Sequence, residues 1–577
     1  MTCHKLLRIM FGPLVTAFVL KSVGGETFRA KSYCTSSTRR TLILPVSVFS
    51  LALAACGAGS GSQTPPPPPD FTLTVSPMSA SAVVGTTSSE VTISVSPKNG
   101  YSSPVTVVLS GLPSGVTISP GSSLTIQPGE SQTLTFSVPV SAPIGVFPLN
   151  ISGNGGSVSH VTQIFLTSEP VVTVRTYQSG SMLYLESDSG TDVARVGLNV
   201  AWGGSIVEVS LNDTNFVNED GTGREVQVAQ WDGAAQYDSC AGCTGMFGWN
   251  PVQAGDKWNN GSPVLAQTVN ADSIYVMTQP IQWNPDDKGG GPNTPVLGDI
   301  YVEQTISAVT NHSSTFKVHY KVTHFGTDQH ANALQEFPAV YVNLGYDKFL
   351  SDSSTNPWTN SVLTPVTMPQ LPTSGPVLYA SEHWGAFVDA NGSGLTVFVP
   401  GMSNYVDGFA AAGDTGPFGF GTNYFDPQTN FSFGPNSVLE GDVYLVAGDN
   451  KHARQVIYDL HNILPAVDIS TPVATLDTPT AGEQLSGNVD VAGWAFDNVA
   501  VAKVDVYIDG AFAGTAVYGG SRPDVARDWP NAPTNVGFTF PLNTATLLNG
   551  NHIIQVRATD TNGNVAVLPN LPVSIHN

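Results

Sequence analysis

The chain has 577 residues, more than one hydrophobic core can serve, so we expect three or four domains. Its formal net charge of −22 excludes most nucleic-acid partners, because an acidic chain repels a phosphate backbone. Only 11% of the residues are charged, glycine and proline are abundant, and no long helical apolar periodicity follows the N-terminus. This composition is typical of secreted all-β modules.

The first 55 residues predict an export signal. Two arginines and an apolar run lead into the letters LAAC, which end at Cys56. This order resembles a bacterial lipoprotein signal, and the resemblance implies that Cys56 is lipidated and becomes the first mature residue. The alternative is an ordinary secretory signal with an incidental cysteine. The resemblance predicts an outer-membrane or cell-surface protein that contacts the membrane through its lipid anchor only.

Two segments, residues 70–168 and 467–577, have the pattern of small β-sandwiches. Residues 56–69 precede the first, and their glycines, serines and five consecutive prolines predict a spacer. Both segments alternate apolar and polar residues between short Gly, Asn and Pro turns, and seven or so such strands in about 100 residues favour an Ig-like sandwich. Both segments resemble the bacterial Ig-like modules of surface proteins.

The centre, residues 170–463, holds seven of the nine tryptophans and long loops rich in Asn, Gly, Asp and Pro, among them GFGTNYFDPQTN (419–430). Its strands alternate, as from Phe316 to Val322, and nearly 300 such residues predict a large two-sheet sandwich. The opening VAWGGSIVEVSLNDTNFVNEDGTGREVQ resembles galactose-mutarotase-like supersandwich domains, which occur in sugar-processing enzymes. The predicted fold is therefore all-β: a large central β-sandwich, supersandwich-like, flanked by two Ig-like β-sandwiches.

The letters SEHWGAF place Glu382, His383 and Trp384 together between two predicted strands. Neighbouring strand residues point to opposite faces, so Glu382 and Trp384 are expected on one side and His383 on the other. An indole stacks on a sugar ring, and an apolar neighbour raises the pKa of a carboxyl group towards that of a general acid. The alternative is a strand end with a packed tryptophan.

A second group lies in HFGTDQHANALQEFPAVYVN, where His330 and Glu336 flank the start of an apolar strand. A glutamate there needs a partner or a function. The mutarotase resemblance implies a histidine acid with a glutamate base, and a satisfied structural His–Glu pair is the alternative. We therefore predict Glu382, Glu336 and His330 as catalytic residues in one cleft. The predicted substrate-binding residues are Trp384, Trp358, His383, Trp258 and Asp407.

Cysteines and acidic loops give weaker signals. Cys240 and Cys243 form a lone CxxC, which in an oxidising compartment predicts a short disulfide rather than a zinc site. No complete metal motif is present, so the predicted site has no metal and no cofactor. A structural calcium ion at residues 218–225 or 284–291 stays open, although neither segment has EF-hand spacing.

The leading functional hypothesis is hydrolysis of a neutral glycan by paired carboxylates. The central segment has only ten Lys and Arg residues, which disfavours a lyase that must neutralise uronic acids. Three alternatives stay open: a glycan-binding protein or adhesin without catalysis, a polysaccharide lyase or sugar epimerase, and a purely structural surface protein.

Overall fold

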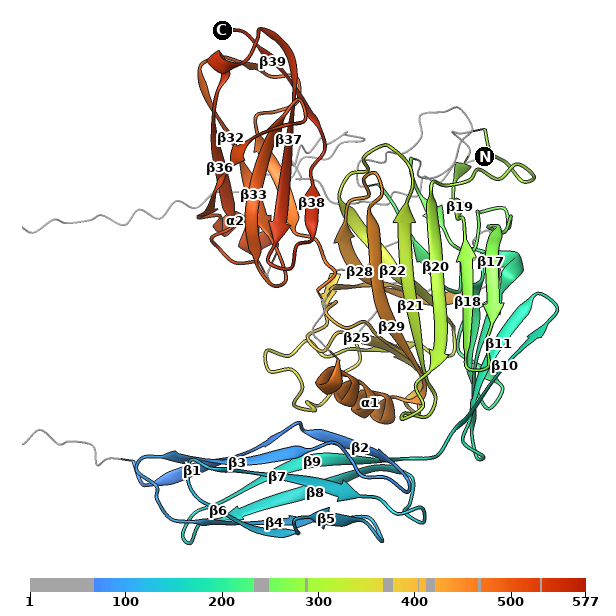
Figure 1. Ribbon diagram of the computed structural model, residues 1–577, viewed down its shortest axis with the longest axis vertical. Coiled ribbons are helices and arrows are strands. Elements are labelled where there is room, and N and C mark those ends of the chain that lie inside the picture. Colours follow the sequence, from blue (N-terminus) through green and yellow to red (C-terminus); the bar gives the residue numbers. More distant parts are fainter. Residues whose placement is uncertain are drawn as a thin grey trace, which may run out of the picture. The chain divides into compact units, whose positions relative to one another are not determined.

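The computed structural model describes residues 67–232, 248–285, 289–366, 377–402, 404–410, 421–464, 468–529 and 532–577. The chain divides into Met1–Pro69 and Asp70–Asn577, and the described strands belong to the second unit. They pack as pairs of β-sheets (Figure 1), which confirms the predicted all-β sandwich class. Among the described residues, no helix has the length and apolar character needed to cross a bilayer.

The N-terminal module is a two-sheet sandwich with its own core. Alternation puts Phe71, Leu73 and Val75 of the first strand inward, as the sequence pattern predicts, and Phe136 and Leu166 meet them from other strands. One sheet has the order β1-β3-β7-β5 and the other β2-β9-β8-β4-β6. The strands are β1 (Asp70–Ser76), β2 (Ser79–Val83), β3 (Val91–Lys98), β4 (Val105–Ser110), β5 (Thr117–Ser119), β6 (Ser123–Ile126), β7 (Ser131–Ser137), β8 (Gly145–Asn154) and β9 (Ser159–Glu169).

The central sandwich consists of a 12-stranded and an 8-stranded sheet. The 12-stranded sheet runs β10 (Thr173–Ser179), β11 (Met182–Asp188), β12 (Val193–Asn199), β13 (Ser205–Leu211), β15 (Val226–Ala229), β22 (Ala333–Asn343), β28 (Thr422–Phe431), β27 (Asn404–Ala410) and β24 (Val377–Tyr379), with β14 (Thr214–Asn215), β16 (Pro251–Val252) and β19 (Ile281–Gln282) beside this path. The 8-stranded sheet runs β17 (Val264–Val269), β18 (Ser273–Thr278), β20 (Ile300–Ala308), β21 (Thr315–His324), β29 (Val438–Asp449), β26 (Ser393–Phe398), β25 (Trp384–Val388) and β23 (Lys348–Leu350). A 3-10 turn, η1 (Val200–Trp202), joins β12 to β13.

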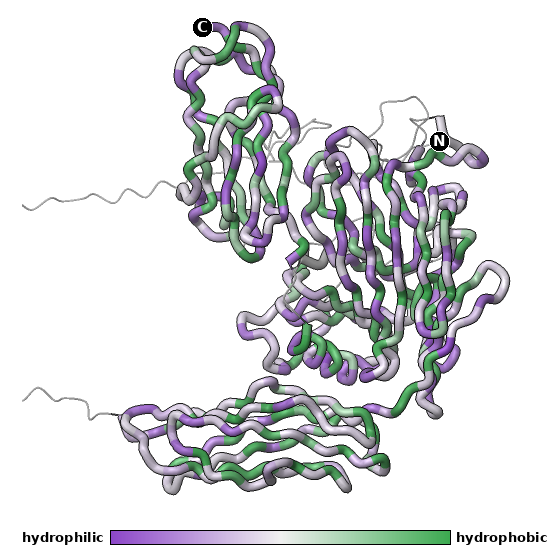
Figure 2. Tube along the Cα trace, viewed as in Figure 1, coloured by the Kyte–Doolittle hydropathy of each residue, from purple (hydrophilic) through white to green (hydrophobic). Residues whose placement is uncertain are grey.

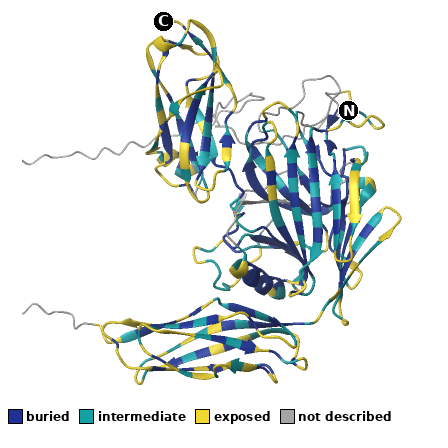
Figure 3. Ribbon diagram, in the orientation of Figure 1, coloured by how far each residue is buried: buried dark blue, intermediate teal, exposed yellow. Residues whose placement is uncertain are grey.

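The main core lies between these two sheets, and period-2 alternation builds it. On β21 the residues Phe316, Val318, Tyr320 and Val322 are fully buried, as predicted. Figure 2 shows apolar and polar residues alternating along the strands, and Figure 3 shows much of the two large sheets buried. The segment 419–430, predicted as a loop, is instead mostly strand β28, because it pairs with both β22 and β27.

One helix of the central sandwich, α1 (Asn450–Ile463), was not predicted from the sequence. Asp449 caps its first turn by accepting hydrogen bonds from the backbone of Lys451 and His452. Its apolar stripe is short, but Val456 and Ile457 pack with Trp384 of β25 in a separate core cluster. Tertiary packing, rather than a long periodic pattern, stabilises this helix.

The C-terminal module is a third sandwich with its own core around Val491, Val506 and Val556. One sheet comprises β30 (Val473–Thr478), β32 (Asn488–Phe496), β36 (Gly537–Asn543) and β35 (Val517–Gly520). The other comprises β31 (Gln484–Leu485), β39 (Leu571–Ile575), β37 (Gly550–Asp560), β33 (Val501–Ile508), β34 (Ala511–Thr515) and β38 (Val565–Val567). Two short helical turns, α2 (Pro523–Asp528) and η3 (Thr544–Thr546), complete it.

Candidate functional site

Glu382 lies inside the protein rather than in a cleft. Its side chain is fully buried, and both carboxylate oxygens bond to Arg454 at 3.0 Å. Tyr458 donates its hydroxyl proton at 2.5 Å, the Trp384 indole donates at 3.0 Å, and the backbone N–H of Trp358 donates at 2.8 Å. Glu382 and Trp384 do lie together, as the alternation argument expected, but they are enclosed under α1. This environment gives Glu382 a structural role and removes the basis for a catalytic one.

The other residues of this group also pack internally. Trp384 has no exposed surface, and the Trp358 ring stacks on His461 with centroids 3.6 Å apart. His383 adopts a left-handed backbone with φ of 59°, and its Nδ1 accepts a hydrogen bond from the backbone N–H of Gly401. Burial, together with the nearby His461, lowers the pKa of His383 to about 4. The predicted glycan-binding surface at residues 382–384 is therefore a packed cluster.

Glu336 lies elsewhere, on the outer face of the 12-stranded sheet. It is half-buried on β22 and its Oε1 accepts a hydrogen bond of 2.7 Å from the Tyr424 hydroxyl of β28. The Tyr424 and Tyr341 rings lie 4.6 Å apart between centroids. Asp426, two residues further along β28, is fully buried and accepts a hydrogen bond from Gln428. We name Glu336, Tyr341, Tyr424 and Asp426 the β22–β28 polar strip.

Electrostatics keep the tyrosine of this strip protonated. Burial is the largest cause, and the carboxylates of Asp426 and Glu336 add to it, so the pKa of Tyr424 is raised well above its usual value. A protonated phenol beside a carboxylate is a proton donor–acceptor pair. No sequence motif marks it, but the polar alternation of Tyr424 and Asp426 around buried Phe425 was an available signal.

A hollow of about 380 Å³ lies where β22 ends. Asn343 lines it on β22, and the loop after β14 adds Asn218, Glu219 and Asp220. Burial and the negative charge of Glu208 raise the pKa of Glu219. Three of the lining residues belong to segment 218–225, which is one of the two places considered for calcium. The polar lining of the hollow consists mainly of amide and carboxylate groups. Of the other segment, 284–291, residues 286–288 lie outside the described part of the chain.

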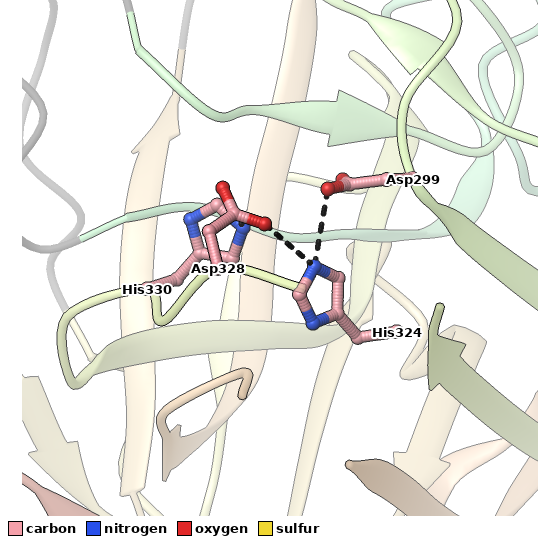
Figure 4. A group of neighbouring side chains, drawn as sticks. All are labelled: Asp299, His324, Asp328 and His330. Atoms are coloured by element: carbon pink, nitrogen blue, oxygen red, sulfur yellow. Dashed lines mark hydrogen bonds and ion pairs between the residues drawn. The ribbon is translucent and has the colours of Figure 1, made fainter. Parts of the chain in front are cut away.

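His330 belongs to a different group, which Figure 4 shows with Asp299, His324 and Asp328. One potential ligand atom from each residue lies within 4.8 Å of the others. Asp299 immediately precedes β20, His324 ends β21, and the other two lie in the loop before β22. The His324 Nε2 atom is 3.1 Å from Asp299 Oδ2 and 3.7 Å from Asp328 Oδ1. We name these four residues the His/Asp cluster.

Neighbouring groups orient the cluster. The His324 Nδ1–H donates to the Gly434 carbonyl at 2.8 Å, and His330 Nδ1 lies 3.1 Å from Asp232 Oδ2. Trp249 stacks on His330 with centroids 4.0 Å apart and donates its indole proton to Asp299. Although burial opposes it, hydrogen bonding to His324 and Trp249 lowers the pKa of Asp299 to about 2.

The sequence predictions thus divide among three places. His330 lies in the His/Asp cluster, Glu336 lies in the β22–β28 polar strip, and Glu382 lies under α1. Trp258 is half-buried with the ammonium of Lys257 4.4 Å from its ring centroid. Asp407 lies on β27, but its side chain is outside the described residues, as are Cys56, Cys240 and Cys243. Their predicted roles stay predictions.

The sequence analysis singled out His330 but missed its grouping with Asp299, His324 and Asp328. The letters HFGTDQH do carry a signal, because a histidine at the end of one strand is followed within six residues by an aspartate and a second histidine. The fourth member comes from the neighbouring strand, where Ile300 pairs with His324. Only that register brings Asp299 to the histidines.

The comparisons with known proteins concern mainly the fold. Residues 472–556 match the family model of the bacterial Ig domain. This match lies within the C-terminal module and agrees with the predicted Ig-like sandwich there. No curated protein matches the chain.

Several solved structures are similar to parts of the chain. An endo-β-1,4-mannanase from Thermotoga petrophila is 16% identical over 22% of this chain and 25% of its own, with a TM-score of 0.14. A polysaccharide lyase is 8% identical over 70% of this chain and 48% of its own, with a TM-score of 0.25. Fibronectin(III)-like modules from Clostridium thermocellum are 18% identical over 18% of this chain and 94% of their own, with a TM-score of 0.13. The chain spans a quarter of the mannanase and about half of the lyase, and these similarities carry no argument about activity.

Proposed function

We propose that the central sandwich acts on a neutral glycan, with Glu336 and Tyr424 as its acid–base pair. The observation that supports this proposal is the 2.7 Å hydrogen bond from the Tyr424 hydroxyl to Glu336, with Asp426 and Tyr341 on the same face of the sheet. This proposal retains Glu336, which the sequence predicted as catalytic. It replaces Glu382 with residues of β28.

The chemistry requires a group that gives a proton and a group that takes one. Tyr424 holds its proton because burial raises its pKa, and Glu336 is positioned to accept one. Asp426 is fully buried, so we assign it the role of keeping Tyr424 protonated through its charge, and not contact with a sugar. The half-buried Tyr341 ring, packed beside Tyr424, offers an aromatic group for a sugar, and the hollow beside Asn343 offers amide and carboxylate partners for hydroxyl groups.

A glycan-binding protein without turnover is the second candidate. It is favoured by the small exposure of Tyr424, which is 6%, and by the full burial of Asp426. A lyase or epimerase would use the same tyrosine–glutamate pair to move a proton at a sugar carbon. We further propose that Cys56 anchors the protein at the outer membrane or cell surface, with the Ig-like modules as spacers.

The test is a panel of neutral polysaccharides, assayed for new reducing ends and, in parallel, for affinity. Glu336→Gln and Tyr424→Phe should each lower turnover by roughly 10²–10⁴-fold while the far-UV spectrum and melting temperature are kept. Tyr275→Phe is the matched control, because Tyr275 donates to Glu303 at 2.8 Å on the 8-stranded sheet. This control should leave turnover unchanged.

Three outcomes separate the candidates. Binding without new reducing ends supports the binding protein. A polysaccharide that contains uronic acids is added to the panel, and products from it that carry a new carbon–carbon double bond, seen by ultraviolet absorbance, support a lyase. If Glu336→Gln keeps full turnover on a substrate that the wild type degrades, the acid–base assignment is wrong.

A further inference from the structure

We propose that the His/Asp cluster of the central sandwich, formed by Asp299, His324, Asp328 and His330, binds a divalent transition-metal ion, with Zn²⁺ as the best fit. This site goes beyond the proposed glycan activity and does not depend on it. The sequence analysis predicted no metal, because the four residues form no contiguous motif.

The orientation of the two imidazoles is the first argument. His324 gives its Nδ1 proton to the Gly434 carbonyl, and His330 directs Nδ1 to the Asp232 carboxylate. In both rings Nε2 is therefore left to face the two aspartates. A carbonyl or carboxylate behind a ligating histidine is the arrangement that fixes its tautomer in metal sites.

An unsatisfied atom is the second argument. His330 is only 5% exposed, and its Nε2 is buried with no hydrogen-bond partner. Its nearest charged neighbour, Asp328 Oδ2, is 3.7 Å away, which is too far for a hydrogen bond. A buried nitrogen of this kind normally has a partner. A network made only of ion pairs leaves His330 Nε2 without a hydrogen-bond partner, whereas a bound metal ion would give this nitrogen a partner.

Gly326 supplies the third argument, because it keeps open the space between the ligand atoms. A Cβ atom at this position would lie 2.5 Å from His324 Nε2 and 2.9 Å from Asp328 Oδ1, and closer still to Asp299 Oδ2. Three ligand atoms thus converge on a point that only glycine leaves empty. Ligands about 2.0–2.1 Å from a shared tetrahedral ion lie about 3.3 Å apart, close to the 3.1 and 3.7 Å spacings here.

The donor set selects the ion. Two imidazole nitrogens with two carboxylate oxygens suit Zn²⁺ and its first-row neighbours, whereas Ca²⁺ and Mg²⁺ prefer oxygen ligands alone. Access is provided by Asp328, whose side chain is 64% exposed, while the histidines are buried. The site therefore has two buried histidine ligands and one aspartate ligand at the surface.

The experiment uses the purified full chain, stripped with a chelator and dialysed against Zn²⁺, with bound metal measured by mass spectrometry. We expect about one equivalent per chain and a higher melting temperature than for the stripped protein. Co²⁺ in place of Zn²⁺ should give the intense visible bands of a tetrahedral ion. Asp232→Asn, behind His330, should weaken Zn²⁺ binding by about 10–100-fold.

Gly326→Ala is the decisive variant, because it keeps all four ligands and fills the space between them. It should abolish metal binding, whereas Gly345→Ala, whose added methyl group meets nothing within 4 Å, should not. Should Gly326→Ala fail to fold, Asp328→Asn replaces an exposed carboxylate and should also weaken binding. The proposal is overturned if the wild type binds no metal, if His330→Ala binds it as tightly, or if only Cys240→Ser/Cys243→Ser loses it.

Discussion

At the scale of single residues, burial decides what a carboxylate does. Glu382 and Glu336 each stand beside an aromatic residue in the sequence, and each was predicted as catalytic. Glu382 is fully buried with Arg454, while Glu336 is half-buried on an outer sheet face. Since a buried ion pair is costly to break, the first is a structural residue and the second is still available for chemistry.

Glu382→Gln should therefore act on stability. Among the described residues, the substitution leaves the Arg454 guanidinium with Asp352 as its carboxylate partner, and it should lower the free energy of unfolding by about 3 kcal/mol. Urea denaturation measures this. Glu440→Gln, at a partly exposed pair with His319, should change it by less than about 0.5 kcal/mol. Unchanged stability with a large loss of turnover would return Glu382 to the list of catalytic candidates.

At the scale of elements, the ends of strands bring acidic residues together in the C-terminal module. In the C-terminal module Asp497 follows β32, Asp560 ends β37, and Asp468 lies beside them. Burial is the main cause that raises the pKa of Asp497 to about 7, and the charges of Asp468 and Asp560 contribute. Three acids and no histidine form this cluster.

This raised pKa predicts a pH dependence of stability. Between the unfolded value of about 3.9 and about 7, the folded module holds a proton that the unfolded chain has lost, so stability falls as pH rises through this range. Asp497→Asn keeps the acceptor for the backbone N–H groups of Val499 and Ala500 but removes the charge. Its melting temperature should exceed the wild-type value more at pH 8 than at pH 5. An equal difference at both pH values would contradict the assignment.

At the scale of the whole molecule, the main hydrophobic core of each of the three predicted sandwiches is separate from the other two. The site candidates all lie in the central one, and the match to the bacterial Ig domain lies in the last. In chain order the proposed site lies between the two Ig-like modules, and the proposed lipid anchor at Cys56 precedes all three sandwiches.

Cys56→Ala tests that placement. If Cys56 carries lipid, the variant should move from the membrane fraction to the soluble fraction of cells, because a lipidated N-terminus is the proposed membrane contact. Immunoblots of the two fractions measure this, and Cys240→Ser provides a cysteine control that should stay with the membranes. A Cys56→Ala protein that remains fully membrane-bound would contradict lipid anchoring.

The sequence by itself determined the strand content and most of the inward faces. Alternation from Phe316 to Val322 and from Phe71 to Val75 is a local property with a period of two, so it can be read without knowing any partner strand. The strand-and-turn pattern of the C-terminal module can also be read from the sequence alone, and it agrees with the match to the bacterial Ig domain.

Only the tertiary structure decided which polar residues meet and which are enclosed. α1 was missed because its stability comes from packing on β25. β28 was predicted as a loop because it is rich in Asn, Asp and Pro, whereas its pairing with β22 and β27 makes it a strand. Glu336 meets Tyr424, and His324 meets Asp299, through strand pairings between residues far apart in the chain. Pairing register and burial depend on the whole fold, and no local pattern encodes them.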